Sequence, residues 1–366
     1  MPTFVIGDPQ APFAKVLEVL DRHGVLAGDR IAEGVTLVSI GDHFDFNVEA
    51  PAEAAREGLK TLRWLASHDP SQAVLLFGNH DAARVMELAH LDDETFQTAR
   101  VLGREIDHVA KTVGPQAGQD REKEFHATYP TLPSSGVISR DYASFTTEQR
   151  ALVIELLLAN RFSLARTCVL DDGRPALLTH AGVTNRELAM LGIEFASEPR
   201  LIATTLAQFF SLAIDRVRPA WAKGETAALS LAPLHVTGAN GEEGGGLLYH
   251  RPTNPASSKI DLRWAASSER PRRFDPRELP IGVTQVVGHT GHAKCVYELA
   301  AWTTEAARAR KRGGIRTLRV TDKSVVYDTG VLPASHGATD MIFVDGELRR
   351  LPAHEVPLLR VDRLEG

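Results

Sequence analysis

The chain of 366 residues has only two cysteines, Cys168 and Cys295. Two cysteines cannot form the disulfide framework of a small secreted scaffold, and they favour a reducing compartment. The N-terminus lacks a charged segment followed by a signal-type apolar core, and no stretch approaches the roughly 20 apolar residues of a membrane span. We therefore expect a cytoplasmic protein without membrane contact.

A dense block of lysine and arginine is also missing. The net charge is −6, and the short basic cluster 308–312 is interpreted as a solvated helix end rather than a contact surface. This balance argues against general nucleic-acid binding and disfavours a nuclease. With 43% hydrophobic and 24% charged residues, the composition is that of an ordinary globular protein, and the sequence does not indicate an oligomeric state.

What the chain does contain is a repeated pattern in which a short apolar run ends in a glycine and then a polar ligand. The runs at 3–6, 35–40 and 73–77 lead to Asp8, Asp42 and Asn79, respectively. Helical patterns at 13–23 and about 52–67 lie between them, so two βαβ units are expected. Two later runs, 176–178 and 282–287, lead to His180 and His289. Since α/β folds bind ligands at the carboxyl ends of their strands, these side chains are expected to meet.

The remaining chain predicts one large domain over residues 1–335, with a C-terminal extension, 336–366, packed on it. Residues 82–145 predict a mostly helical insertion over the strand ends, and such insertions shape substrate choice. Residues 223–280 are rich in glycine and proline. We interpret them as an active-site loop in preference to a linker, because strands resume after them.

Further segments are predicted from apolar spacing and capping residues. The expected helices are about 82–91, 96–113, 147–159 (opened by a capping box at Thr146 and Gln149) and about 186–222; the expected strands are 165–170, 176–178 and short strands within 315–328 and 341–351.

The polar residues at the strand ends form a ligand set for divalent metals. It comprises carboxylates, imidazoles and amide oxygens, which suit Mn, Fe, Zn, Co or Ni better than Ca. One ion needs fewer ligands than this set offers, so two ions bridged by Asp42 are expected. Such a pair would activate a bridging water as a hydroxide that attacks phosphorus. The candidate ligands are Asp8, Gln10, Asp42, Asn79, His180 and His289, with His292 nearby.

A general acid is expected next to this set. His80 follows the ligand Asn79 directly, so its ring can face the substrate and protonate the leaving oxygen. Asp45, three residues after Asp42, is the predicted partner that keeps His80 protonated and oriented. A single Gly-Asp after a strand is more often a turn, and a single histidine there is more often only hydrogen-bonded. Five such strand ends in one chain make the metal site the stronger interpretation.

With these motifs the sequence resembles the calcineurin-like metallophosphoesterase superfamily. The motifs are Gly7-Asp8-Pro9-Gln10, Gly41-Asp42-His43-Phe44-Asp45, Gly78-Asn79-His80-Asp81, Thr179-His180-Ala181-Gly182 and Gly288-His289-Thr290-Gly291-His292. Val326-Tyr327-Asp328-Thr329-Gly330 also resembles the branch of Ser/Thr phosphoprotein phosphatases and symmetrical diadenosine tetraphosphate hydrolases.

The resemblance implies an α/β fold (an α+β four-layer sandwich) in which two mixed β-sheets pack between helices, and it makes residues 1–335 the catalytic domain. It divides Asp8, Gln10, Asp42 and His289 or His292 between two metal ions, with Asn79 and His180 on the second.

The sequence departs from the family pattern at three positions. Gln10 replaces a histidine, which makes a weaker, neutral ligand and favours a harder ion such as Mn²⁺ or Mg²⁺. Phe46 stands where the phosphoprotein-phosphatase branch has an arginine that clamps phosphate, and Arg251 or Arg186 is the expected substitute. His292 is one residue farther from His289 than in Gly-His-x-His, so it is a ligand, a supporting group or only a neighbour.

These residues predict a two-metal phosphoesterase, with Mn as the favoured metal and Fe, Zn, Co, Ni or Mg as alternatives. The expected substrate is a phosphorylated small molecule, such as a nucleotide or dinucleoside polyphosphate, or a phosphoprotein; the lost arginine favours the small molecule. The alternative is a non-catalytic, regulatory metal-binding scaffold of the same fold. Asp45 and His80 argue against that alternative, because a scaffold has no need of a general acid and its partner.

Overall fold

The fold is known from a computed structural model, which describes residues 2–193, 198–257 and 272–365. The predicted helical segment from 186 to 222 and the predicted loop over 223–280 each include residues that lie outside these ranges. Among the residues described, no helix is both long and apolar enough to cross a membrane.

The centre of the molecule is an 11-stranded mixed β-sheet with the order β15-β14-β16-β13-β8-β7-β17-β1-β4-β5-β6. β1, β4, β5 and β6 are parallel to one another, and so are β8, β13 and β16. The strands are β1 Thr3–Ile6, β4 Thr36–Ser39, β5 Ala73–Leu76, β6 Phe162–Ser163, β7 Ala165–Leu170, β8 Pro175–Thr179, β13 Thr284–Val287, β14 Arg316–Val320, β15 Val325–Thr329, β16 Thr339–Phe343 and β17 Leu359–Glu365.

β17 joins the two halves of this sheet. Its first residues pair antiparallel with β1, and its last residues pair antiparallel with β7, with an irregularity in register between Val361 and Arg363. A bulge of this kind bends a strand and lets it pass from one packed sheet to another. The sheet is therefore folded at β17, and the carboxyl ends of β8 and β13 reach the same edge as those of β1, β4 and β5.

The two halves pack against each other through apolar side chains. The cluster between them contains Val5, Val38, Val286, Ile342 and Val361, all almost completely buried. Every buried member of this cluster lies on a strand or directly beside one, so each half-sheet covers the other. The α/β class with a mixed sheet between helices is confirmed. Hydrogen bonds through β17 connect what we expected as two separate sheets into one folded sheet.

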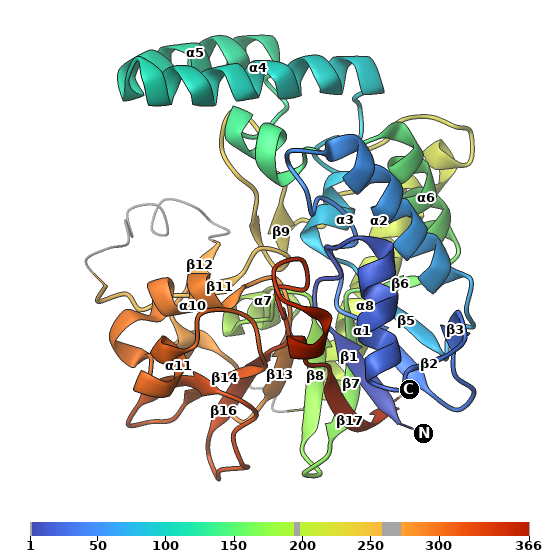
Figure 1. Ribbon diagram of the computed structural model, residues 1–366, viewed down its shortest axis with the longest axis vertical. Coiled ribbons are helices and arrows are strands. Elements are labelled where there is room, and N and C mark those ends of the chain that lie inside the picture. The colour runs from blue at the N-terminus through green and yellow to red at the C-terminus, as the bar shows by residue number, and fades with distance from the viewer. Residues whose placement is uncertain (1, 194–197, 258–271, 366) are drawn as a thin grey trace.

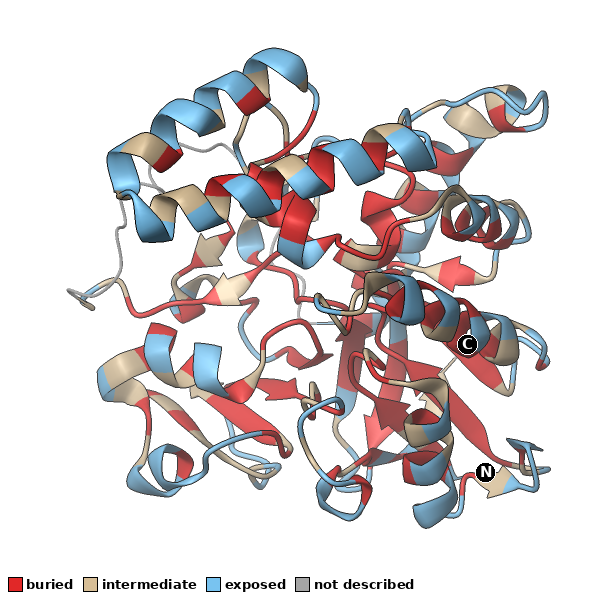
Figure 2. Cartoon of the chain, turned by 45° about the horizontal axis from the view of Figure 1, so that its top comes forward, coloured by how far each residue is buried: buried red, intermediate tan, exposed pale blue. Residues whose placement is uncertain are grey.

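Helices cover the outer faces of both halves (Figures 1 and 2), with their apolar sides on the strands and exposed sides outward. α1 and α2 complete the two predicted βαβ units, and α6 begins at the predicted capping box of Thr146 and Gln149. α10 and α11 pack on the half containing β14 and β15. The bounds are α1 Phe13–Arg22, α2 Pro51–Ala66, α6 Thr147–Leu158, α7 Asn185–Met190, α8 Pro199–Trp221, α10 His292–Leu299 and α11 Glu305–Ala309.

The segment between β5 and α6 contains α3 (Asn79–Ala83), α4 (Asp93–Thr112), α5 (Pro115–Thr128) and the short π-helical turn η1 (Val137–Asp141). The antiparallel α4 and α5 lie at one end of the molecule (Figure 1), and they share a small apolar core with η1. The predicted helix over 82–91 is wrong beyond Ala83. Turns follow there because the Val85 carbonyl accepts a hydrogen bond from the Leu229 amide instead of a helical one.

The glycine- and proline-rich region forms short pairs of strands. β9 (His235–Val236) pairs with β10 (Gly245–Gly246), and β11 (Arg251–Pro252) pairs with β12 (Arg273–Phe274). A further pair, β2 (Leu26–Ala27) and β3 (Arg30–Ile31), follows α1. Cys168 and Cys295 are free and buried, and burial raises their thiol pKa values to about 12 and about 11, so neither is a ready nucleophile at neutral pH.

The folded sheet predicts that stability depends on the apolar residues of β17. Val361→Ala removes two methyl groups from the fully buried space between the halves and is expected to cost about 2–3 kcal/mol of unfolding free energy. The matched control Arg360→Ala lies on the exposed face of the same strand and should change stability by less than about 0.5 kcal/mol. Urea denaturation measures both. Equal effects of the two variants would contradict this account of β17.

Candidate metal centre

The strand ends that carry polar residues meet at one edge of the sheet. Gly41 and Gly78 lie in contact there, since a Cβ on Gly41 would stand 2.6 Å from the Gly78 nitrogen and a Cβ on Gly78 would stand 2.3 Å from Asp42 Oδ1. Asp42, Asp45 and His289 have φ angles of 60°, 67° and 60°, which are unfavourable for residues with a side chain. Such backbone strain is concentrated at functional sites, where the surrounding structure imposes it.

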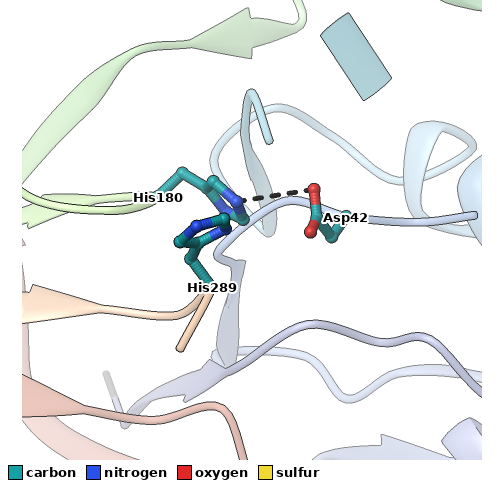
Figure 3. A group of neighbouring side chains, drawn as sticks. All are labelled: Asp42, His180 and His289. Carbon is teal, nitrogen blue, oxygen red and sulfur yellow. Dashed lines mark ion pairs between the residues drawn. The ribbon is translucent and has the colours of Figure 1, made fainter. Parts of the chain in front are cut away.

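Asp42, His180 and His289 form a buried group whose potential ligand atoms all lie within 4.8 Å of one another. The three side chains converge from different strand ends, as Figure 3 shows, and His180 Nε2 lies 3.5 Å from Asp42 Oδ1. Asn79 joins them, because its Oδ1 lies 3.0 Å from His180 Nε2 and 2.9 Å from His289 Nδ1. Two imidazoles, a carboxylate and an amide oxygen thus surround one small volume.

The hydrogen bonds of His180 fit a metal in this volume. Its Nδ1 lies 2.8 Å from the Ile40 carbonyl, which can only accept, so a neutral His180 carries its proton on Nδ1. Its Nε2 lone pair then faces the Asn79 oxygen, another electron-pair donor. Two ligand atoms about 2.1 Å from one ion, at right angles, are about 3.0 Å apart, which is the spacing found here.

His289 fits the same interpretation. Burial, together with nearby Arg251 and His180, holds its pKa well below the usual range, so its imidazole is neutral and has a lone pair to offer. Its Nε2 is buried and has no hydrogen-bond partner among the described residues. A buried polar atom without a partner is costly, and a bound cation or water would relieve that cost.

Asp8 and Gln10 lie beside this group and line the same cavity. Both carboxylate oxygens of Asp8 accept from the His289 amide at 3.1 Å. Burial and the neighbouring carboxylates of Asp345 and Asp42 raise the pKa of Asp8 well above its usual value. A divalent cation would offset this repulsion and allow all the carboxylates to be ionised. The amide nitrogen of Gln10 is buried without a hydrogen-bond partner among the described residues.

His80 and Asp45 form the expected pair. His80 Nδ1 lies 2.9 Å from Asp45 Oδ2, and His80 Nε2 lies 3.8 Å from Asp42 Oδ2. Burial alone would lower the pKa of His80, but Asp42 and Asp45 raise it above the usual value. The two carboxylates therefore favour the protonated form of His80.

Arg84 and Ser144 hold Asp45 in place. Arg84 Nη1 lies 2.6 Å from Asp45 Oδ2, and both the amide and the hydroxyl of Ser144 donate to Oδ1, at 2.9 and 2.7 Å. Although burial opposes ionisation, Arg84 and His80 keep the pKa of Asp45 far below its usual range. Asp45 is thus a fixed negative charge behind His80.

Five of the metal-ligand candidates line a cavity of about 250 Å³, namely Asp8, Gln10, Asp42, Asn79 and His289. Tyr142 and Tyr249, whose hydroxyls are in contact, also line it, and their rings stand edge-on to His80 and His289, respectively. Its lining also includes cationic side chains, namely Arg251, Arg272, Lys294, Arg349 and Arg350. A cavity lined by both carboxylates and cations is suited to a metal-bound, negatively charged substrate.

Two predicted site residues lie elsewhere. Both ring nitrogens of His292 have protein partners, since Nδ1 lies 2.9 Å from the Tyr327 hydroxyl and Nε2 lies 2.9 Å from the Ala307 carbonyl. Arg186 does not line the cavity and pairs with Glu278 at 3.0 Å. We therefore leave His292 out of the proposed ligand set and Arg186 out of the proposed substrate contacts.

Comparison with known proteins gives one result. The family model for calcineurin-like phosphoesterase matches residues 1–182, about half of the chain. The matched half contains Asp8, Asp42, Asn79 and His180. These residues are similar to the calcineurin-like phosphoesterases. No curated protein and no solved structure matches the chain. The similarity supports metal-dependent phosphoester hydrolysis, and the group of Asp42, His180 and His289 offers a place for a metal.

The sequence interpretation missed several residues of this cavity. Asp345 follows β16 but stands before its glycine, Gly346, whereas Asp8, Asp42, Asn79 and His289 each follow a glycine, so the pattern of strand, glycine and ligand did not reveal it. Tyr142 at the end of the insertion, and Tyr249 and Arg272 from the glycine- and proline-rich region, gave no local signal. They reach the cavity only through the tertiary fold.

The geometry separates the two histidines of the last motif. His289→Gln is expected to weaken Mn²⁺ binding on the order of 100-fold or more, because it removes an imidazole from the buried group. His292→Gln should leave the affinity within about threefold, since His292 contacts no candidate ligand, whatever it costs in folding stability. Isothermal titration calorimetry on metal-stripped protein measures both, and the reverse order of effects would restore His292 as a ligand.

Proposed function

We propose that this protein is a two-metal phosphoesterase that transfers a phosphoryl group to water. One observation supports this above the rest: the buried group of Asp42, His180 and His289 lies beside a hydrogen-bonded His80–Asp45 pair in the same cavity. A metal site alone would serve a scaffold. A histidine that lines the same cavity and is hydrogen-bonded to a buried carboxylate is suited to protonate a leaving group, for which a scaffold has no need.

In this proposal Asp42 would be a ligand shared by two ions. Asn79, His180 and His289 would hold one ion with it, and Asp8 and Gln10 would hold the other. When bound, the ions would lower the pKa of a water molecule and neutralise charge on the phosphoryl oxygens. Mn²⁺ is the favoured ion because the ligands mix neutral imidazoles with amide and carboxylate oxygens, and Gln10 adds a hard, neutral donor.

The protein's own groups then orient and protonate the substrate. His80 gives its proton to the leaving oxygen from Nε2, while Nδ1 stays bonded to Asp45. Arg84 and Ser144 keep Asp45 ionised and immobile, so the imidazolium is held in one orientation. Tyr142 stands edge-on to the His80 ring and limits how far that ring can tilt.

Arg251 is the proposed contact for the phosphate, in place of the arginine that Phe46 replaces. It lines the cavity, and its Nε is buried without a hydrogen-bond partner among the described residues. Arg272 lines the same cavity, with its guanidinium carbon 4.4 Å from the Tyr249 ring centre. The cavity is small and lined by two tyrosines, which favours a nucleotide or dinucleoside polyphosphate over a phosphoprotein.

The first experiment titrates metal-stripped protein with Mn²⁺ and follows hydrolysis of p-nitrophenyl phosphate and bis-p-nitrophenyl phosphate. Turnover should depend on Mn²⁺, and Asp42→Asn should abolish it because both ions lose their shared ligand. The ratio of monoester to diester hydrolysis selects the next substrates. Folded protein that binds Mn²⁺ but hydrolyses neither ester, nor any nucleotide or dinucleoside polyphosphate, would contradict the enzymatic proposal and favour the scaffold.

A second experiment tests the general acid through the leaving group. His80→Asn should lower kcat for phenyl phosphate by about 100-fold to 10,000-fold, because phenoxide needs a proton to leave. The loss with p-nitrophenyl phosphate should be much smaller, since p-nitrophenolate leaves without help. Asp45→Asn keeps the shape of the side chain but removes its charge. It should also lower kcat more for phenyl phosphate than for p-nitrophenyl phosphate, but each loss should be smaller than in His80→Asn. Equal losses on both esters would exclude His80 as the acid.

A further inference from the structure

The end of β16 brings one more carboxylate to the metal centre. β16 runs parallel to β13 with Val287 beside Phe343, and the Val344 amide donates to the Val287 carbonyl at 2.8 Å. Two residues beyond that pair stand His289 on one strand end and Asp345 on the other. Asp345 and His289 therefore occupy equivalent positions at the ends of two neighbouring parallel strands. Both residues line the cavity.

The backbone around Asp345 is packed directly against the strand end that carries Asp8. A Cβ on Gly7 would stand 2.2 Å from the Val344 carbonyl oxygen and 2.7 Å from Asp345 Cα, so only glycine allows this contact. Arg316 Nη1 donates to the Asp345 carbonyl at 2.9 Å, and the Glu347 amide donates to Asp345 Oδ1 at 2.9 Å. These bonds fix the residue, and neither of them uses its second carboxylate oxygen, Oδ2.

Gly291 makes room for that second oxygen. Asp345 Oδ2 lies 3.3 Å from the position that a Cβ on Gly291 would take, closer than most real Cβ contacts, and Gly291 lines the same cavity. A side chain at position 291 would compete with the Asp345 carboxylate for this place. His289 lines the same cavity, and its buried Nε2 has no hydrogen-bond partner among the described residues.

We propose that Asp345 is a further ligand of the metal held by Asp8, Gln10 and the shared Asp42. Oxygen atoms from three strand ends, those of β1, β4 and β16, would then bind this ion. The inference rests on the proposed two-metal function and adds a residue to it. An oxygen-only set of carboxylates and an amide suits Mn²⁺ or Mg²⁺ better than Zn²⁺. The two sites therefore differ in chemistry, with nitrogen-rich ligands at His180 and His289 and oxygen ligands at Asp8, Gln10 and Asp345.

Asp8, Asp42 and Asp345 do not lie as close together as Asp42, His180 and His289, which form the group within 4.8 Å among the described residues. The nitrogen-rich site is thus nearly formed in the fold, while the oxygen-rich site would close when an ion draws its carboxylates together. The ion at Asp345 is expected to bind second and more weakly.

The test compares Mn²⁺ binding to the full chain, Asp345→Asn and Asp345→Ala by calorimetry and electron paramagnetic resonance. The unmodified protein should bind two Mn²⁺ ions and give the signal of a coupled pair. Both variants should retain one ion with its affinity unchanged, lose the other or bind it at least about tenfold more weakly, and give the signal of isolated Mn²⁺. Asp345→Asn has the same shape as the native side chain, so it should fold if Asp345→Ala does not.

Asp141→Asn is the matched control, because Asp141 is an exposed carboxylate that lines the same cavity. It should bind two ions as the unmodified protein does. Two ions of unchanged affinity in both Asp345 variants, or a single ion in the unmodified protein that Asp345 does not affect, would overturn the inference and leave the site at His180 and His289 intact. Absence of Mn²⁺ binding in the unmodified protein would overturn the proposed function with it.

Discussion

The contact between glycine-bearing strand ends is the constraint on which the rest of this structure depends. Gly41 touches Gly78, and Gly7 touches the backbone of Val344 and Asp345, at distances that exclude any side chain. The polar side chains at these strand ends can reach one small volume only if the backbones that carry them approach this closely. The fold at β17 makes the approach possible, because it turns the second half of the sheet so that its strands end at the same edge as those of the first.

Bringing these strand ends together concentrates negative charge, and the site handles that charge in two ways. Asp45 is paired with Arg84 and His80 and keeps a pKa far below its usual range, so it is ionised with protein groups alone. Asp8 and Asp345 lie in the opposite situation, since burial raises the pKa of each. The protein thus supplies a counter-charge for Asp45, the proposed partner of the general acid, whereas the carboxylates of the proposed metal site would be neutralised by the ions.

The sequence could predict the parts of this site that are coded locally. A short apolar run followed by glycine and a polar residue predicted where Asp8, Asp42, Asn79 and His289 would lie, and a run followed by a histidine predicted the place of His180, because strand formation and the tight turn after it depend on neighbouring residues. β17 was missed, since its alternation of buried and exposed residues is ordinary and its importance comes from pairing with strands more than 180 residues away. Residues on such segments, among them Tyr249 and Arg272, had no local signal.

His292 and Asp345 show why spacing alone is not enough. His292 lies three residues after His289, but α10 begins at that residue and turns its ring toward Tyr327 and the Ala307 carbonyl. Gly291, one residue earlier, lies at the cavity and has no side chain to offer. The Asp345 carboxylate lies against that position from a different strand end. The ligands of such a metal centre therefore depend on which strand ends meet in the fold. If one strand end lacks a ligand, the neighbouring strand end in the sheet can supply it, and a sequence motif read from the first strand end alone would not show this.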